Sequence, residues 1–458
     1  MRHVPAITLT TAQRWAFAGV NVPFAILHAP ALGTLPALYA KYAHLDLVFM
    51  GLVLTLARVL DCVLDPITGY ASDRTVSRFG RRKPWIFAGA LLASVSAYFV
   101  FRPSPATGAA YFALWYFLLY VGWTLGEIPH TAWLSELSHN YDERSHLSTL
   151  RKTAGLIGGL MFPLIAFLPI FPTTDITPDV TAFASYLVIV LMPITVFWAL
   201  RSLPNDTAAA PNRTPLIEVL RGVARNRPFW IYMASNACSG LGSGMVAALF
   251  FFYLDSYLGI GSKLAHITIM VFVASLLGTN FWLRVMYRIG KHRTLAICCA
   301  TSMLTLVVMA MIRPGDYAFW AIFVVFATSA FCATGYEAAG MAMMADIVDY
   351  DTLKTGDRRA GNYFAAMSFV SKLNLAAGGG VALILVGLFG FSPSKPNGTL
   401  AMTGFFTVFI AIPIVLNALA AWFAWRFPLD RRRQDIVRRR IEDRDLRAAQ
   451  ASATGVSP

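Results

Sequence analysis

Two aspartates lie one helical turn apart in an apolar stretch of the chain. Asp61 and Asp65 are four positions apart and Arg58 precedes Asp61 by three, so in a helix all three share one face. Each charge would cost about 2.5–3.5 kcal/mol at the centre of a bilayer on insertion scales. Two carboxylates on one stripe can ligate a hard monovalent cation or hold one proton between them. The alternative is a structural ion pair between Arg58 and Asp61, which would leave Asp65 without a basic partner.

Glu127 lies in a second apolar stretch, "VGWTLGEIPHTAW", close to Thr124, Pro129 and Trp133. A carboxylate accepts hydrogen bonds from sugar hydroxyls, and an aromatic face covers the apolar side of a pyranose ring. The stretch therefore indicates a sugar site. A structural carboxylate bonded to a neighbouring helix is the alternative, and Trp133 alone is weaker evidence because tryptophan is also common at membrane interfaces.

Lys372 lies in a third such stretch, "AMSFVSKLNLAAGGGVALILVG". An ammonium in this setting needs an anionic partner, and Asp61, Asp65 and Glu127 are the candidates. A lysine so placed can sense whether a cation site is filled. A static salt bridge is the alternative.

These stretches must be positioned by membrane-spanning helices. The chain has 458 residues, of which 57% are hydrophobic and 14% charged, with a mean hydropathy of +0.58. Soluble proteins carry about 25% charged residues, and a bilayer-crossing helix needs about 20 apolar ones. Twelve spans are expected, near Trp15–Tyr39, Leu47–Ser72, Pro84–Phe101, Ala109–Glu136, Ser148–Ile170, Thr181–Leu200, Phe229–Tyr257, Ala265–Tyr287, Thr294–Ile312, Tyr317–Ala345, Asn362–Leu388 and Gly398–Phe427.

The chain reads as two halves with an internal repeat. Residues 1–200 and 228–427 would each hold six spans, residues 201–227 form a polar linker, and residues 428–458 form a basic tail. The loop "RFGRRKPW" resembles "RIGKHRTL" at a shift of 210 positions, and the same shift carries Glu127 onto Glu337 and Glu136 onto Asp346. Two parallel six-helix halves around a central cavity form the architecture of the major facilitator transporters.

The net charge of +14 is explained by topology and does not require a nucleic-acid partner. With the N-terminus inside, most basic residues fall in inner segments, which places both termini in the cytoplasm. The outer loops carry only Lys41, Arg102, Lys263, Arg313 and Lys395. The tail either binds anionic lipid or anchors the topology.

The five cysteines have no disulfide or metal spacing and read as packing residues.

Several longer motifs resemble the glycoside–pentoside–hexuronide:cation symporters. The matching segments are "RVLDCVLDPITGYASDRTVSRFGRRKPW", "GEIPHTAW", "ELSHNYDERSHLSTLR" and "MADIVDYDTLKTGDRRAGNYFAAMSFVSK". They run in order from the second span to the eleventh. The resemblance implies roles for six residues. Asp61, Asp65 and Thr124 would bind the coupling cation, and Glu127, Arg151 and Lys372 would bind the sugar.

The sequence departs from the sodium-coupled, melibiose-transporting members of that family at three places. Leu64 stands where they have an asparagine, "GVNVPFAIL" (with Asn21 and Pro23) lacks their first-span aspartate, and Glu127 replaces an aspartate. The first departure removes a neutral ligand and favours a proton over sodium. The other two leave the identity of the sugar open.

The sequence therefore predicts an all-α membrane protein of twelve helices in two pseudo-symmetric halves. We expect a monomeric secondary transporter of the bacterial inner membrane, not an enzyme. It would carry a sugar or glycoside by alternating access, with H⁺ or Na⁺ as coupling ion and no cofactor. The alternative cargo is a lysolipid or other amphipathic solute. Gating or structural ion pairs are expected from Arg58, Asp73, Arg81, Arg82, Glu337 and Asp346, with basic loops locking an inner gate.

Overall fold

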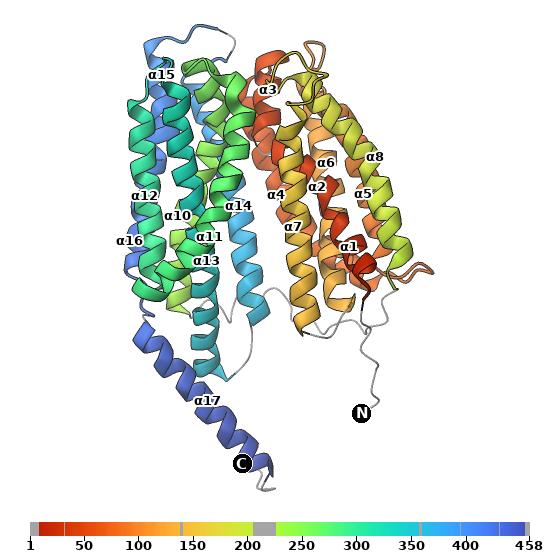
Figure 1. Ribbon diagram of the computed structural model, residues 1–458, viewed down its shortest axis with the longest axis vertical. Coiled ribbons are helices and arrows are strands. Elements are labelled where there is room, and N and C mark those ends of the chain that lie inside the picture. The colour runs from red at the N-terminus through yellow and green to blue at the C-terminus, as the bar shows by residue number, and fades with distance from the viewer. Residues whose placement is uncertain are drawn as a thin grey trace.

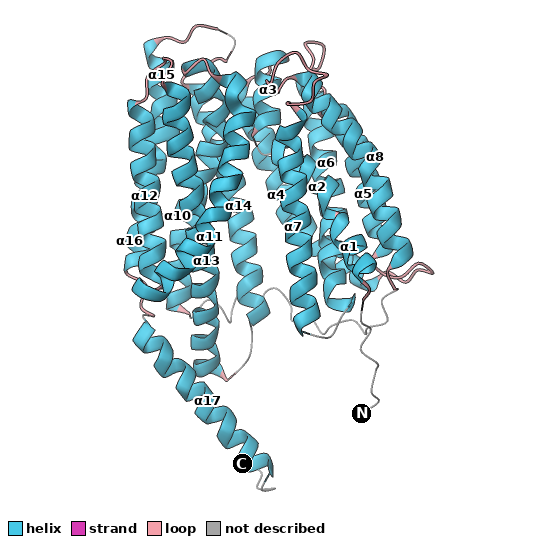
Figure 2. Cartoon of the chain, viewed as in Figure 1, coloured by secondary structure: helices cyan, strands magenta, loops and turns pink. Residues whose placement is uncertain are grey.

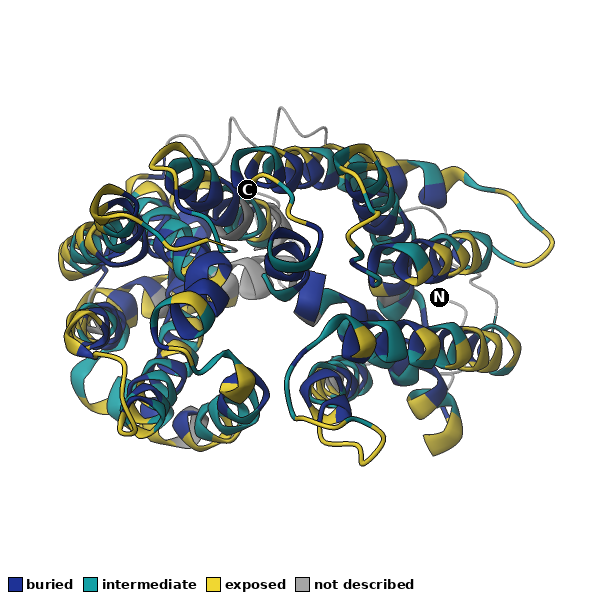
Figure 3. Cartoon of the chain, turned by 90° about the horizontal axis from the view of Figure 1, so that it is seen from above, coloured by how far each residue is buried: buried dark blue, intermediate teal, exposed yellow. Residues whose placement is uncertain are grey.

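The computed structural model describes residues 9–31, 33–137, 141–204, 226–356, 360–393, 395–429 and 431–453. Within these ranges every regular element is helical (Figure 2). The helices form two bundles side by side, and the first and the last helix lie toward the same end of the molecule (Figure 1). Seen from above, the exposed residues lie mainly on the rim and the buried ones toward the middle (Figure 3).

The described residues of the first half form eight helices. They are α1 (Thr11–Gly19), α2 (Asn21–Ala31), α3 (Thr34–Tyr42), α4 (Leu47–Arg74), α5 (Lys83–Val100), α6 (Ala109–Leu137), α7 (Tyr141–Ile165) and α8 (Pro178–Ser202). The second half follows residues 205–225 of the expected linker, which lie outside the described residues.

Two helices of the second half contain a wider, π-helical turn. The elements are α10 (Arg227–Phe252) with η1 (Tyr253–Tyr257), η2 (Gly261–Lys263), α11 (Leu264–Ile289), α12 (Lys291–Met311), α13 (Ala318–Thr355), α14 (Ala360–Leu388), then α15 (Thr399–Phe406), η3 (Thr407–Ala411) and α16 (Ile412–Trp425) in succession, and finally α17 (Arg431–Ala453).

Ten helices among the described residues are long and apolar enough to cross a membrane. The first expected span, Trp15–Tyr39, is divided among α1, α2 and α3. Pro30 in α2 lacks an amide hydrogen, which weakens the helix there. The fifth span begins at Tyr141 rather than Ser148, with a polar first part. The all-helical class is confirmed, and the count of twelve stays a prediction.

Two elements extend beyond what the sequence predicts. Helix α13 continues to Thr355, ten residues past the expected end of its span. The basic tail forms α17, which packs against α13: Gln434 donates to Asp349 at 2.9 Å, and Arg444 donates to the carbonyl of Thr352 at 3.0 Å. The tail is therefore a docked helix.

The two halves are in contact at the end opposite the termini. Helices α4 and α14 approach so closely at Gly51 and Gly380 that a Cβ on Gly51 would lie 2.5 Å from the carbonyl oxygen of Gly380. Lys41 at the end of α3 forms a 2.8 Å ion pair with Asp255 of η1. These contacts close the interface between the halves at this end (Figure 1).

We predict that Gly380→Val prevents the halves from closing at this end. A Cβ on Gly380 would overlap Oγ1 of Thr55 on α4. Spin labels at Ala106 and Ser262, in the outer loops of the two halves, should move apart in Gly380→Val. Gly159→Val is the matched control, because a Cβ there meets nothing within 4 Å. Equal label distances in the two variants would contradict the prediction.

Candidate functional site

Asp61 is enclosed by partners from its own half. Its side chain is 3% exposed. Oδ1 accepts a hydrogen bond from the hydroxyl of Thr124 on α6, and Oδ2 lies 3.6 Å from Nη1 of Arg58, one turn earlier on α4. The structure thus brings together Asp61 and Thr124, two of the three residues expected at a cation site.

Arg58 is held by α6. Its Nη2 donates to the hydroxyl of Tyr120 at 2.8 Å, and its guanidinium lies 4.4 Å from the centre of that ring. Tyr116, one turn earlier on α6, in turn donates to the carbonyl of Ala31 at 2.9 Å. Arg58 is therefore a fixed cation beside Asp61. The sequence analysis did not identify Tyr120 as a site residue. Its position one helical turn before Thr124 on the same helix could have indicated that it lies near Asp61.

Asp65 forms an ion pair across the interface between the halves. Nζ of Lys372 on α14 donates to Oδ2 of Asp65 on α4 at 2.6 Å. Oδ1 of the same carboxylate is buried and has no hydrogen-bond partner among the described residues. Lys372 thus pairs with one of its three expected candidates, and Asp65 keeps one oxygen unused.

Glu127 and Arg151 form an ion pair between α6 and α7. The second oxygen of Glu127, Oε2, is buried and has no hydrogen-bond partner in the part of the chain that the structure describes. Asn21 lies where the family's first-span acid is missing, and its amide donates to the backbone carbonyl of Arg151 at 3.1 Å. This second site therefore combines the Arg151 cation with a carboxylate oxygen of Glu127 that can accept a hydrogen bond from a hydroxyl.

Trp133 does not lie at this site. It is 1% exposed and belongs to the core of the first half, with the Phe17 ring 6.4 Å away and the Lys83 ammonium 5.7 Å from its own ring. A ring so fully covered has no free face for a sugar. The aromatic ring in contact with a charged residue of the site is instead that of Tyr120, beside Arg58, and Trp123 lies with its ring 4.6 Å from that of His28.

The basic loop of the first half pairs with acids at helix ends. Arg82 forms ion pairs with Asp73, at the end of α4, and with Glu136, at the end of α6; the Arg82–Glu136 distance is 2.7 Å. Arg81 lies 3.5 Å from the same carboxylate of Glu136. All these contacts lie within one half, so they fix the helix ends of that half.

The second half repeats this arrangement. Lys291 at the start of α12 pairs with Asp346 of α13 at 2.6 Å, which matches the Arg81–Glu136 pair at a shift of 210 positions for both residues. The other repeated acid, Glu337, is exposed on α13 and has no ion pair with a described residue. The charge that acts on it is Lys152 of α7, in the opposite half.

Comparison with known proteins agrees with this architecture. A family described as MFS/sugar transport protein matches residues 16–431. The chain belongs to this family. Membership points to transport rather than catalysis, and the resemblance seen in the motifs is confirmed.

Individual relatives are distant but cover most of the chain. The isoprimeverose transporter of Lactiplantibacillus pentosus is 24% identical over 403 residues, covering 84% of this chain and 82% of that protein. The glucuronide carrier protein homolog of Escherichia coli (strain K12) is 24% identical over 416 residues, covering 87% and 88%. The crystal structure of the nucleoside transporter NupG superposes with a TM-score of 0.68 at 12% identity, covering 92% and 100%. This last likeness shows the fold alone.

We predict that the hydroxyl of Thr124 stabilises the buried Asp61. A hydrogen bond to a charged group contributes about 1.5–3 kcal/mol. Thr124→Val should therefore lower the melting temperature of the purified protein, whereas Thr124→Ser, which keeps the donor, should lower it much less. Equal melting temperatures for the two variants would show that Asp61 does not depend on this donor.

Proposed function

We propose that this family member is a secondary active transporter that carries a sugar or glycoside together with a cation by alternating access. The observation that carries the proposal is the Asp65–Lys372 ion pair. It joins α4 of one half to α14 of the other, one turn from the enclosed Asp61. A charge pair that bridges two moving halves can link their positions to the occupancy of a cation site.

The coupling step follows from competition for Asp65. A cation or proton that binds this carboxylate neutralises the charge that holds Lys372, because one carboxylate cannot fully satisfy two cations in a medium of low dielectric. Lys372 is then free to bind solute oxygens or to find another acid. Binding of the cation thus prepares the other half for the solute.

A proton fits these residues better than a sodium ion does. Sodium needs several oxygen ligands, and the candidate oxygens come from Asp61, Asp65 and Thr124. Both oxygens of Asp61 face partners, one oxygen of Asp65 accepts from Lys372, and Leu64 offers none. One carboxylate oxygen of Asp65 remains, which can hold a proton. We therefore propose proton coupling.

A sugar or glycoside fits the second pair of charges. The unpaired Oε2 of Glu127 can accept from a hydroxyl, and the Arg151 guanidinium can donate to a ring or glycosidic oxygen. Support also comes from the relatives, which are named for carrying isoprimeverose and glucuronide. The alternative, an amphipathic lysolipid, is disfavoured because its apolar chain offers no hydrogen bond to the buried Oε2 of Glu127.

Alternating access requires that the closed end can open. The contacts at this end are of two kinds: close glycine-mediated packing of α4 on α14, and the Lys41–Asp255 pair at the rim. Both side chains of the rim pair keep some contact with solvent, which weakens an ion pair, so this pair can break during each cycle. The basic loops, paired within each half, can keep each bundle rigid while the halves rock.

The transport function is tested by uptake into proteoliposomes across a panel of sugars and glycosides. Gradients of both protons and sodium are imposed together, so that a positive result does not depend on the identity of the cation. We expect accumulation of at least one sugar above equilibrium. No accumulation of any sugar, with uptake of a lysolipid instead, would contradict the proposed cargo.

Coupling is tested by neutralising the acids on α4. Asp61→Asn and Asp65→Asn should abolish gradient-driven accumulation of the identified sugar while leaving some exchange, because the halves can still rock. Asp316→Asn, an exposed acid in the loop before α13, is the control and should accumulate sugar like the wild type. Full accumulation by both α4 variants would leave Asp61 and Asp65 with a structural role only.

A further inference from the structure

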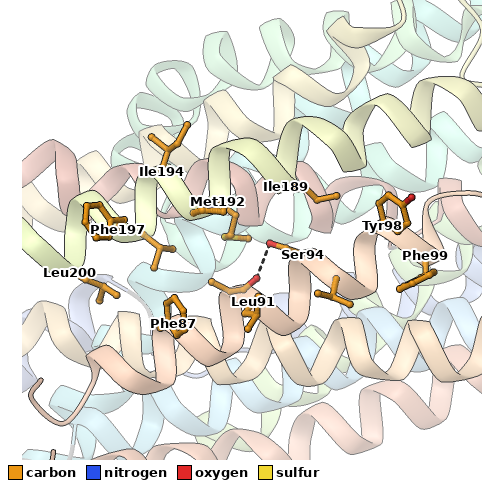
Figure 4. Close-up of a pocket in the computed structure, with 14 residues that line it drawn as sticks. Phe87, Leu91, Ser94, Tyr98, Phe99, Ile189, Met192, Ile194, Phe197 and Leu200 are labelled. Atoms are coloured by element: carbon orange, nitrogen blue, oxygen red, sulfur yellow. Dashed lines mark hydrogen bonds between the residues drawn. The ribbon is translucent and has the colours of Figure 1, made fainter.

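A groove of about 720 Å³ lies between α5 and α8 on the outside of the first half (Figure 4). Its floor is made by buried residues, and its walls by large apolar side chains that are exposed. The floor residues are Ala90, Ser94, Met192 and Val196. The walls include Phe87, Leu91, Ile194 and Phe197, which are 57–66% exposed.

The groove offers almost no polar group to a ligand. Its serine, Ser94, donates to the carbonyl of Ala90 at 2.8 Å, so this hydroxyl is already used (Figure 4). From Phe87 to Phe99 the α5 wall is about 18 Å long at a rise of about 1.5 Å per residue, comparable to half of a hydrocarbon core of about 30 Å. These dimensions fit an acyl chain lying within one leaflet.

A cation that has no anionic partner among the described residues lies at one end of the groove. Arg102 follows α5 at the end opposite the termini, and its guanidinium lies 3.6 Å from the ring centre of Tyr98 and 4.6 Å from that of Tyr186. It makes no hydrogen bond or ion pair with any residue that the structure describes. At the other end of α5, Lys83 donates to the carbonyls of Leu200 and Leu203, at 2.7 and 2.8 Å. The free cation thus lies at one end only.

The second half has a corresponding groove. It has a volume of about 860 Å³ and lies between the end of α12 and the continuous α15–η3–α16 helix. Arg313 lines it and follows α12 as Arg102 follows α5, 211 positions earlier, close to the repeat of 210. The Arg313 side chain likewise has no ion pair within the described ranges. The second groove also carries Thr399, Thr403 and Thr407, but most of the side chains that line it are apolar, as in the first. A mainly apolar groove beside an arginine that has no ion pair with a described residue therefore recurs, which points to the same kind of ligand in both halves.

We propose that each groove binds a phospholipid of the leaflet opposite the termini. One acyl chain lies along the helices, and the phosphate is held by Arg102 in the first half and by Arg313 in the second. Arginine suits this role because its planar guanidinium donates two parallel hydrogen bonds to phosphate while its faces stack on aromatic rings. The lipids would anchor the outer helices of each half during transport, separately from the solute site.

The proposal is tested by native mass spectrometry of the full-length protein released from detergent micelles. Phosphatidylglycerol is titrated against Arg102→Gln, Arg313→Gln and the double variant. The control is Lys395→Gln, which removes an exposed outer-loop charge that lines neither groove. Near a membrane surface one basic residue strengthens lipid binding about five-fold. We therefore expect the wild type and the control to retain two lipids each. Each single variant should bind one of the two lipids about five-fold more weakly, and the double variant should bind both about five-fold more weakly.

Diacylglycerol, which lacks the phosphate, is the second probe and should be retained weakly by all variants alike. Ser94→Leu, which fills the floor of the first groove, should also lose one phosphatidylglycerol while Arg102 is intact. A melting temperature near that of wild type shows that each variant is folded. Equal retention by the double variant and the control would overturn the proposal, as would equal retention of the two lipids. A dimer with no bound lipid would overturn it too, because a second copy would then cover the groove.

Discussion

The arrangement depends on the free energy of placing charge inside a helical bundle in lipid. Each of the three carboxylates at the candidate site has a cation or donor as its partner: Asp61 has Arg58 and Thr124, Asp65 has Lys372, and Glu127 has Arg151. Two of these sets lie within one half, and the Asp65–Lys372 pair crosses between halves. A pair within a half stabilises a bundle, whereas a pair across the interface makes the position of the halves sensitive to charge.

Packing at the closed end lets this crossing pair form. Because Gly51 and Gly380 have no side chains, α4 and α14 can approach until Lys372 reaches Asp65 deeper in the interface. The same two helices therefore carry both the steric contact and the charge contact. Opening the closed end would separate the two glycines and, at the same time, pull the Asp65–Lys372 ion pair apart. Coupled transport requires such a link between the position of the halves and the charge on Asp65.

The charged residues of the candidate site could be identified from the sequence, but most of the residues that they contact could not. Spacing predicts Asp61 and Asp65 on one face, and the cost of an unpaired ammonium predicts an acid for Lys372, but only the fold decides among three candidates. Trp133 was expected at the sugar site because of its type, yet tertiary packing buries it beside Phe17. The docking of α17 depends on contacts between distant segments, which periodicity does not contain, whereas Pro30, which weakens the helix in the first span, is visible in the sequence.

The central claim is that Asp65 exchanges Lys372 for a proton during transport. It is tested most directly in sodium-free proteoliposomes that contain a pH-sensitive dye. Addition of the transported sugar outside, with no imposed gradient, should acidify the lumen as sugar enters, and Asp65→Asn should admit sugar without acidification. Sugar entry that requires sodium and moves no protons in the wild-type protein would contradict the account.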